Sequence, residues 1–328
     1  MSNNRSSSSI IHSLLLLLAA FIWGFAFVAQ SAGGDAVGPY TFNCVRSLIG
    51  CLVLYIVIRV RDMIQGKTTV KSSSENAGRK ISPAGLSGGY LKGGIICGSI
   101  LFISSTLQQL GINMGAGAGR GGFLTAAYIL IVPILGLFMH RKCGINVWAG
   151  VAVALAGMYL LCIYGKNEAA GAGDLLLILC AVGFSFHIIF VDKFAPNLDG
   201  IKLSCIQFLV AGILGIIPMS VFEMGIVRGN ISDWINNLMD MGALIPILYA
   251  GVLSCAVAYT LQIIGQEHVE PALASLIMSF ESVFALIGGM LLLGERMALH
   301  EAIGCILMFL AILLAQGIIR LPAHPDAA

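Results

Sequence analysis

The sequence predicts an all-α, polytopic integral membrane protein with ten transmembrane helices. Of its 328 residues, 58% are hydrophobic and 10% are charged, whereas soluble domains are roughly 45–50% apolar and about 25% charged. The apolar residues also gather in runs of about 20, the length that crosses a bilayer as a helix. This composition excludes a disordered chain, a secreted disulfide-rich module and a nucleic-acid-binding protein.

Ten apolar runs account for most of the chain. The first, from Leu14 to Gln30, is long for a signal peptide, and nine further runs follow it, so we interpret it as a helix that is retained. The runs lie near residues 13–31, 40–60, 90–112, 119–139, 145–164, 174–191, 201–222, 242–264, 271–293 and 301–319.

The basic residues between these runs predict the orientation of the chain. Placing the N-terminus inside puts thirteen Lys and Arg residues on the inner side and four on the outer side, with Arg46 left within a helix. Because cytoplasmic loops carry the excess of basic residues, both termini are predicted to be cytoplasmic. The longest polar stretch, residues 61–89, is predicted to be a cytoplasmic loop.

The chain contains an internal repeat. The motif Thr106-Leu107-Gln108 recurs 154 positions later as Thr260-Leu261-Gln262. In the second helix of each half, Cys44-Val45-Arg46 corresponds to Cys205-Ile206-Gln207, 161 positions later. Each half has five predicted helices, an odd number, so the two halves must enter the membrane from opposite sides. Inverted repeats of this kind are typical of secondary transporters, whose substrate site lies near the midplane between the halves.

Two ionisable residues lie deep within predicted helices, where an unpaired charge is costly. Glu281 lies ten residues into the ninth run and is therefore predicted near the midplane. It could act as a proton carrier, as a counter-charge for a cationic substrate group, or as a structural carboxylate at a helix break. Arg46 lies about 9 Å from the outer end of the second helix and could bind a substrate carboxylate or hold a structural partner such as Glu281. If both face one cavity, they would bracket a zwitterion such as an amino acid.

Other polar and aromatic side chains fall at helical spacing on predicted helix faces. Buried amides must hydrogen-bond, either between helices or with a substrate. The candidates for substrate binding or coupling are therefore Glu281, Arg46, Gln262, Tyr259, Gln109, Trp23, Tyr128 and Gln207. Gln30 could also line a pocket, His187 could carry a proton, and Arg120 could attract anions or extend its charge to the membrane surface.

The sequence predicts no catalytic, metal or cofactor site. The nine cysteines lie singly, nearly all within apolar runs, and there is no Cys-x-x-Cys motif and no clustered His. Gly117-x-Gly119-x-x-Gly122 matches a dinucleotide-binding pattern, but it joins two membrane helices and no strand precedes it. Without a phosphate-binding motif for ATP hydrolysis, transport would be driven by a gradient.

Motifs along nearly the whole chain point to one family. They are Trp23-Gly24 with Phe27, Pro39 and Arg46; Gly122-Phe123-Leu124-Thr125 with Val132-Pro133; and Pro271, Ala274-Ser275-Leu276-Ile277, Ser279 to Ala285 and Leu293-Gly294-Glu295-Arg296. Together they resemble the drug/metabolite transporter superfamily, specifically proteins with two EamA repeats. His140-Arg141-Lys142 departs from the usual ending of the first repeat, and Ser282 stands where many relatives have Pro.

The resemblance implies a ten-helix bundle whose fifth and tenth helices lie at the periphery of a central cavity. The expected organisation is a cytoplasmic tail at 1–12, EamA repeats at 13–164 and 173–320, and a C-terminal tail at 321–328. The expected function is export of amino acids or related metabolites by alternating access, with drugs, sugars and nucleotide-derived metabolites as alternative cargo. A membrane-embedded ligand sensor and an intramembrane enzyme are the alternatives from other classes.

The expected partners follow from this function. They are a small-molecule metabolite and the lipid bilayer, with no nucleic acid, and a homodimer is left open. The expected location is the bacterial cytoplasmic membrane.

Overall fold

The computed structural model describes residues 2–71, 88–141, 143–164, 171–224, 231–293, 298–316 and 318, and every regular element in this part of the chain is helical. Eight of its helical segments are long and apolar enough to cross a membrane, and two shorter apolar helices cover Ile145–Leu160 and Leu299–Ala315. The predicted all-α, polytopic fold is therefore confirmed.

The first half consists of six α-helices and a short kinked segment, η1, in which Met114 and Gly115 depart from helical geometry. They are α1 (Ser2–Val37), α2 (Pro39–Lys71), α3 (Gly88–Gly111), η1 (Ile112–Ala116), α4 (Gly117–Thr125), α5 (Tyr128–Phe138) and α6 (Ile145–Cys162).

The second half follows the same plan with more interruptions. Its elements are α7 (Ala172–Phe194), η2 (Ala195–Asn197), α8 (Gly200–Pro218), η3 (Met219–Glu223), α9 (Ile231–Met239), α10 (Met241–Leu248), η4 (Tyr249–Ala258), α11 (Tyr259–Gly265), α12 (Pro271–Met278), α13 (Glu281–Leu293) and α14 (Leu299–Ala315).

Two boundaries differ from the sequence prediction. Helix α1 already begins at Ser2, within the predicted tail, and α2 continues through Lys71, so the predicted loop at 61–89 starts with a helical segment. Residues 61–71 contain no proline, and outside the bilayer a polar helix satisfies its own backbone groups, so polarity alone does not end α2. The remainder of that loop, residues 72–87, lies outside the described residues, as do the C-terminal residues 319–328.

Helix α9 is an element that the hydropathy pattern did not predict. It is only 9 residues long, and its apolar residues are interleaved with polar ones. Trp234 on α9 donates a hydrogen bond from Nε1 to the hydroxyl of Thr41 on α2 (2.9 Å). An amphipathic helix of this length is too short to cross the membrane.

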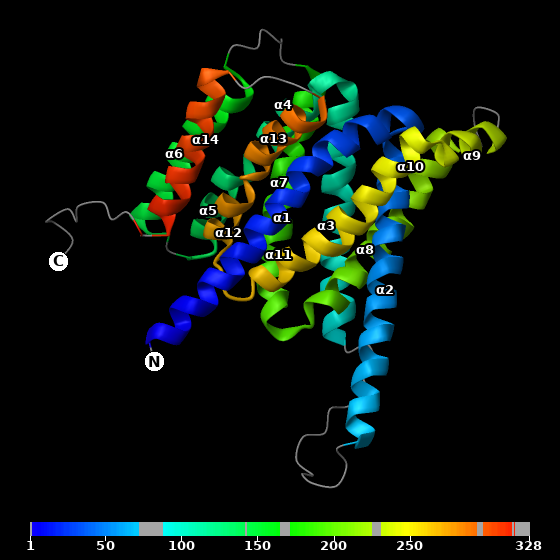
Figure 1. Ribbon diagram of the computed structural model, residues 1–328, viewed down its shortest axis with the longest axis horizontal. Helices are drawn as coiled ribbons and strands as arrows, with labels where there is room; N and C mark the ends of the chain where they lie inside the picture. The colour runs from blue at the N-terminus through cyan, green and yellow to red at the C-terminus, as the bar shows by residue number, and fades with distance from the viewer. Residues whose placement is uncertain are drawn as a thin grey trace, which may run out of the picture.

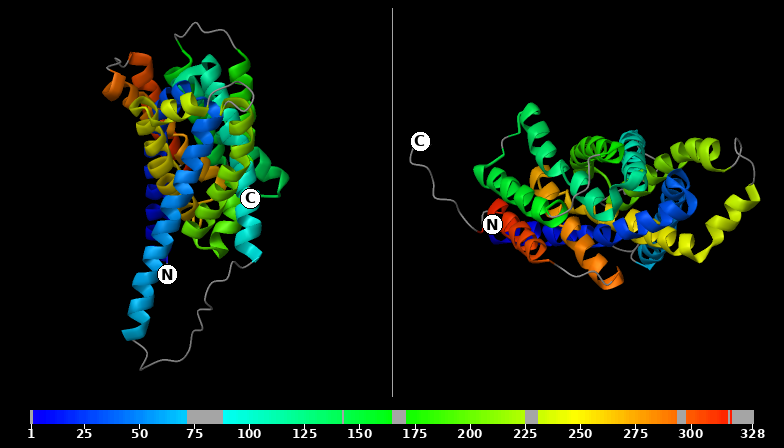
Figure 2. Two further views of the ribbon diagram at one scale, coloured as in Figure 1. Left: turned by 90° about the vertical axis from the view of Figure 1, so that its right-hand side faces the viewer. Right: turned by 90° about the horizontal axis from the view of Figure 1, so that it is seen from above.

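The two halves interlock rather than lying side by side. Helix α2 packs along α8, and α3 packs along both α7 and α8, as Figure 1 shows from one side. In a second view, α2 extends past the other helices at the end of the bundle where α1 begins (Figure 2). We call this end of the bundle the N-terminal face. Because α2 and α8 come from different halves, the centre of the bundle is built from both repeats.

Helices α6 and α14 pack against each other at one edge of the bundle (Figure 1). Glycines allow this close approach: a Cβ added at Gly157 would lie 2.8 Å from the carbonyl oxygen of Gly304, and one added at Gly150 would lie 2.8 Å from that of Ala311. Small residues at such contacts are typical of helix packing in membranes. The fifth helix of each half is therefore peripheral, as the resemblance implied.

The fourth apolar run of each half is broken at the same place. The predicted helix 119–139 is divided into α4 and α5, and 271–293 is divided into α12 and α13. At the breaks the backbone forms tighter turns, in which the N–H of Ile129 bonds to the oxygen of Ala126 and the N–H of Phe280 bonds to that of Ile277. The breaks are 153 positions apart, within one residue of the repeat offset of 154 found in the sequence. Broken helices near the midplane are where transporters of inverted-repeat design place their binding sites.

Candidate functional site

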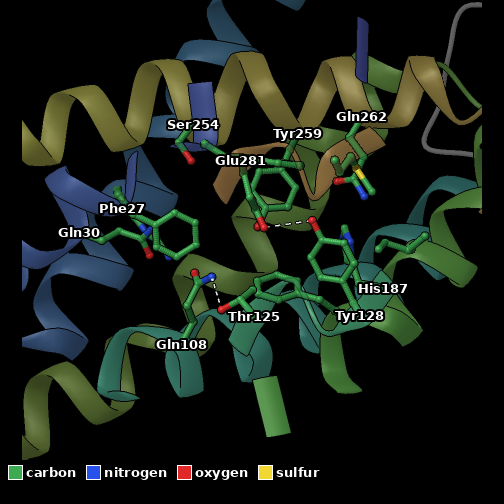
Figure 3. A pocket seen from close by; sticks show the side chains of 15 residues that line it. Phe27, Gln30, Gln108, Thr125, Tyr128, His187, Ser254, Tyr259, Gln262 and Glu281 are labelled. Carbon is green, nitrogen blue, oxygen red and sulfur yellow. Dashed lines mark hydrogen bonds between the residues drawn. The ribbon is translucent and has the colours of Figure 1, made fainter. Parts of the chain in front are cut away.

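A small cavity lies between the two halves, next to both helix breaks. Its volume is about 40 Å³, room for on the order of three water molecules. The lining side chains come from α1, α2, α3, α4 and α5 of the first half and from α7, η4, α11, α12 and α13 of the second (Figure 3). They are Trp23, Phe27, Gln30, Arg46, Gln108, Thr125, Tyr128, Phe184, His187, Ile188, Ser254, Tyr259, Gln262, Met278 and Glu281.

Glu281 is the acidic group of this cavity. It is the first residue of α13, so its carboxylate stands at the N-terminal end of a helix, where the helix dipole favours negative charge. The side chain is 5% exposed, and its Oε1 accepts a hydrogen bond of 3.0 Å from the hydroxyl of Tyr128 (Figure 3). Tyr128 belongs to α5, so the bond joins the two halves at their breaks.

Arg46 is the basic group. The residue is 5% exposed, and its guanidinium donates from Nε and Nη2 to the side-chain oxygen of Asn43 (3.1 and 2.9 Å). The amide of Asn43 in turn donates to the hydroxyls of Ser105 and Thr106 on α3. The guanidinium carbon also lies 5.4 Å from the ring centre of Phe42. Two helices therefore fix the orientation of Arg46.

Arg46 and Glu281 line the same cavity without forming an ion pair. Ion pairs in the described part of the chain include those of Arg61 with Asp62 and Asp199, Arg120 with Asp174, and Arg141 with Asp192, and none of these pairs contains Arg46 or Glu281. Because buried charges are costly when uncompensated, a carboxylate and a guanidinium that face one cavity but not each other are suited to a ligand with both signs of charge.

Several polar atoms in the cavity wall have no protein partner in the described part of the chain. They are Trp23 Nε1, Gln30 Oε1, His187 Nδ1 and Gln262 Oε1. An unsatisfied buried donor or acceptor costs about 1–3 kcal/mol, so a ligand or water that reached these atoms would remove that cost. Donors and acceptors are both present, which matches a polar ligand better than a hydrocarbon.

Tyr259 forms the centre of an aromatic wall on one side of the cavity. Its ring makes edge-on contacts with Trp23, His187 and Phe208, at centroid distances of 4.8, 5.8 and 5.2 Å. Such pairs add about 0.5–1.5 kcal/mol beyond the area they bury. Because Trp23 lies on α1 and Phe208 on α8, the wall holds the two halves together as well as shaping the cavity.

A chain of hydrogen bonds leads from the cavity toward the end of the bundle opposite the N-terminal face. The amide nitrogen of Gln109 donates to the backbone oxygen of Gln30 (2.7 Å) and to the side-chain oxygen of Asn113 (2.9 Å). Asn113 then donates to the carboxylate of Asp35, near the end of α1 (2.8 Å). Polar groups on α1 and α3 therefore extend from the cavity along these two helices.

The structure brings together most of the residues that the sequence singled out. Trp23, Arg46, Tyr128, Tyr259, Gln262 and Glu281 line the cavity, as do the lesser candidates Gln30 and His187. Gln109 and Gln207 are not among the lining residues but lie one hydrogen bond behind it, Gln109 through Gln30 and Gln207 through the Nε2 of His187 (3.1 Å). Both amides are completely buried.

Sequence reasoning missed other cavity residues, chiefly Gln108, Thr125, Ser254 and Phe184. The repeat offset offered a signal for one of them, because Gln108 is the counterpart of Gln262. In the structure its amide donates to the hydroxyl of Thr125 at the end of α4 (3.3 Å; Figure 3). Arg120, by contrast, lies outside the cavity, and its Nη2 pairs with Asp174 at 2.7 Å.

Comparison with known proteins identifies the family. The sequence pattern of the EamA-like transporter family matches residues 10–163 and again residues 171–316. An uncharacterized transporter of Archaeoglobus fulgidus is 24% identical over 92% of this chain and 84% of its own length. The uncharacterized inner membrane transporter YedA of Escherichia coli is 21% identical over 94% of this chain and 91% of its own.

A solved crystal structure shares the fold. It covers 94% of this chain and 98% of its own, with a TM-score of 0.70 and 17% sequence identity. Two successive matches along one chain account for the two repeats, and the relatives are transporters rather than enzymes. The chain therefore belongs to the EamA-like transporter family of the drug/metabolite transporter superfamily and is a multi-pass membrane transporter with two EamA domains.

Proposed function

We propose that this transporter carries small zwitterionic metabolites, amino acids or close relatives, and exports them by alternating access around the central cavity. The observation that carries the proposal is the placement of Arg46 and Glu281 in one cavity, on different halves, with no ion pair between them. Arg46 would bind the carboxylate of the cargo, and Glu281 would bind its ammonium group.

The cavity supports a cycle in which the halves move. At about 40 Å³ it holds only a few waters, so an organic cargo requires the helices around it to separate. The helix breaks beside the cavity are a feature of carriers in which one repeat rocks against the other.

Binding to the purified protein tests the cargo class. Thermal unfolding in detergent would be followed with a panel of amino acids, the amines that lack their carboxylate, and the carboxylic acids that lack their ammonium group. We expect only the zwitterions to raise the unfolding temperature, because each analogue leaves one buried charge without a partner. Equal stabilisation by all three series, or by none of the amino acids, would contradict the proposal.

Two variants assign the charges. Arg46→Gln introduces the residue found at the equivalent position of the second half, and Glu281→Gln keeps an acceptor for Tyr128. Each removes a charged hydrogen bond worth about 1.5–3 kcal/mol, so cargo affinity should fall about 10- to 100-fold. Lys193→Gln, which removes an exposed charge at the end of α7, serves as the control and should bind as the unmodified protein does. Unchanged affinity in both cavity variants would remove Arg46 and Glu281 from the site.

We also propose that the protein lies in a bacterial cytoplasmic membrane with repeats at 13–164 and 173–320 and with both termini in the cytoplasm. The support is the bias of Lys and Arg toward the loops on the side of the N-terminus and the inner-membrane description of YedA. Reporter fusions at the two ends test the orientation. A periplasmic phosphatase should be inactive at both ends, and activity at either end would contradict it.

A further inference from the structure

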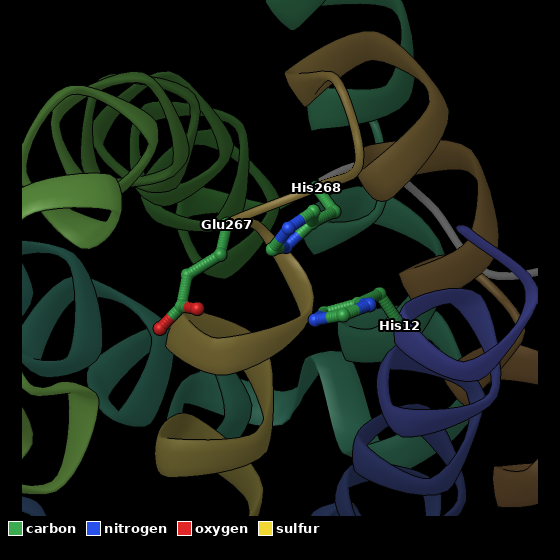
Figure 4. Close-up of side chains that lie close together, drawn as sticks. All are labelled: His12, Glu267 and His268. Carbon is green, nitrogen blue, oxygen red and sulfur yellow. The ribbon is translucent and has the colours of Figure 1, made fainter. Parts of the chain in front are cut away.

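His12, Glu267 and His268 form a cluster at the N-terminal face, away from the transport cavity. His12 lies near the start of α1, and the other two lie in the turn between α11 and α12. Although His12 and His268 are 256 positions apart, their ring centres are 4.2 Å apart, and Glu267 lies beside them (Figure 4). The sequence prediction of no metal site rested on spacing along the chain, which does not reveal this approach.

The donor atoms of the three side chains are close enough to share one ion. One ligand atom from each residue, an imidazole nitrogen from each histidine and a carboxylate oxygen from Glu267, all lie within 4.8 Å of one another. Tetrahedral Zn²⁺ with bonds of 2.0–2.1 Å holds its ligand atoms about 3.3 Å apart. Side-chain rotation is sufficient to bring ligand atoms that lie within 4.8 Å of one another to this separation. His12 and Glu267 are half-buried and His268 is exposed, so an ion can enter from solvent.

The backbone beneath the cluster is tightly packed. A Cβ added at Gly265, two residues before Glu267, would lie 2.7 Å from Leu16 and 3.1 Å from the backbone oxygen of His12. Helix α1 therefore rests directly on the end of α11, which keeps the three side chains together. Asp199 also interacts electrostatically with Glu267, but it is already paired with Arg61 at 2.8 Å, so Glu267 supplies the negative charge that attracts a cation to the cluster.

We propose that His12, Glu267 and His268 bind a divalent transition-metal ion, with Zn²⁺ as the best match. Two imidazoles and one carboxylate are the ligand set of zinc sites that keep a fourth position for water, and Ca²⁺ or Mg²⁺ would require oxygen ligands instead. The ion would join α1, of the first repeat, to the turn between α11 and α12, of the second. It would thereby clamp the two halves at the N-terminal face, independently of which cargo the cavity binds.

Titration of the full-length protein with Zn²⁺ alone tests the site. The protein would be freed of its affinity tag and treated with a chelator, and binding would be measured by calorimetry together with the unfolding temperature. We expect one Zn²⁺ per chain and a rise in unfolding temperature, because the ion binds only the folded arrangement. Ca²⁺ at the same concentration should produce neither effect.

Variants locate the bound ion. His12→Ala, Glu267→Gln and His268→Ala should each weaken Zn²⁺ binding by at least the roughly 10- to 100-fold that losing a supporting partner of a metal ligand costs. His300→Ala removes a histidine near the start of α14 and should leave binding unchanged. Because the metal-free unfolding temperature of each variant reports its fold separately, loss of binding is distinguishable from misfolding.

The site would be disproved by the absence of stoichiometric Zn²⁺ binding. It would also be disproved if binding survived in all three variants, or if it were lost in His300→Ala. Loss of Zn²⁺ binding in His268→Ala with a metal-free unfolding temperature equal to that of the unmodified protein would support the assignment most strongly.

Discussion

Glu281 and Ala127 correspond at the sequence repeat offset of 154 and lie within one residue of the same place at the two helix breaks, yet only one of them carries a charge. Both breaks form the same kind of backbone turn, so the carboxylate is not required to break a helix. Arg46 likewise faces a neutral counterpart, Gln207, in the other half. At both pairs the repeat supplies the backbone and one half adds a charge, which is the pattern expected of residues kept for a ligand rather than for folding.

The hydrogen bond between Tyr128 and Glu281 is predicted to hold the carboxylate in position for the cargo. Tyr128→Phe removes the hydroxyl donor but keeps the ring in the core. Because a hydrogen bond to a charged group contributes about 1.5–3 kcal/mol, the carboxylate loses its fixed direction and amino-acid affinity should fall about tenfold. Calorimetric titration measures this affinity. Tyr159→Phe, on the peripheral helix α6 and 49% exposed, is the matched control, and equal affinities in the two variants would contradict a role for Tyr128.

The sequence could place most of the cavity residues because charges and amides within apolar runs are conspicuous. It could not separate the residues that line the cavity from those one layer behind. Gln109 and Gln207 are amide side chains within apolar runs, as Gln262 is, so the sequence does not distinguish them. Only tertiary contacts direct their amides to Gln30 and His187. Arg120 was ambiguous for a similar reason, since its partner Asp174 lies 54 positions away.

At the scale of helices, hydropathy predicted the ten runs but not their interruptions. The breaks at Ala126–Ala127 and Ser279–Phe280 contain neither proline nor glycine, so the apolar pattern reads through them as continuous helix. The π-helical segment η4 is equally invisible in the sequence, although Ser254 within it faces the cavity. These irregularities depend on neighbouring helices that satisfy the backbone, which a local pattern cannot report.

The close packing of α6 against α14 predicts that a larger side chain at their contact destabilises the protein. Gly157→Val places a branched side chain against the backbone of Gly304. Even a Cβ alone at position 157 would lie 2.8 Å from the carbonyl oxygen of Gly304. Overpacking of this kind costs about 1–3 kcal/mol, so the free energy of unfolding should fall by that amount. Denaturant titration in detergent measures the change.

A glycine in open space provides the control for this variant. A Cβ at Gly88, on α3, meets nothing within 4 Å, so Gly88→Ala should unfold as the unmodified protein does. Amino-acid affinity should be unchanged in Gly157→Val, because no lining residue of the cavity comes from α6 or α14. A stability equal to that of the unmodified protein would contradict the close approach of these two helices.

At the scale of the whole molecule, the two repeats meet around a cavity that neither could form alone. Tyr128 and Glu281, Trp23 and Tyr259, and Cys51 and Cys205 make contact across the two halves. A cargo that bridges Arg46 and Glu281 would contact both repeats, so its binding would depend on their relative position. Movement of one repeat against the other would open the cavity to either side of the membrane. We therefore propose that cargo binding is coupled to movement of the repeats, because the binding site and the scaffold are divided at the same place.

Counterflow of a labelled amino acid in proteoliposomes tests that claim most directly. Vesicles loaded with unlabelled amino acid should accumulate the labelled compound transiently when they contain the unmodified protein or Lys193→Gln. Arg46→Gln and Glu281→Gln should reduce the initial rate about tenfold or more at low cargo concentration, because each loses a charged contact. Counterflow of amino acids at the unmodified rate in both variants, or no counterflow with any amino acid in the unmodified protein, would contradict the account.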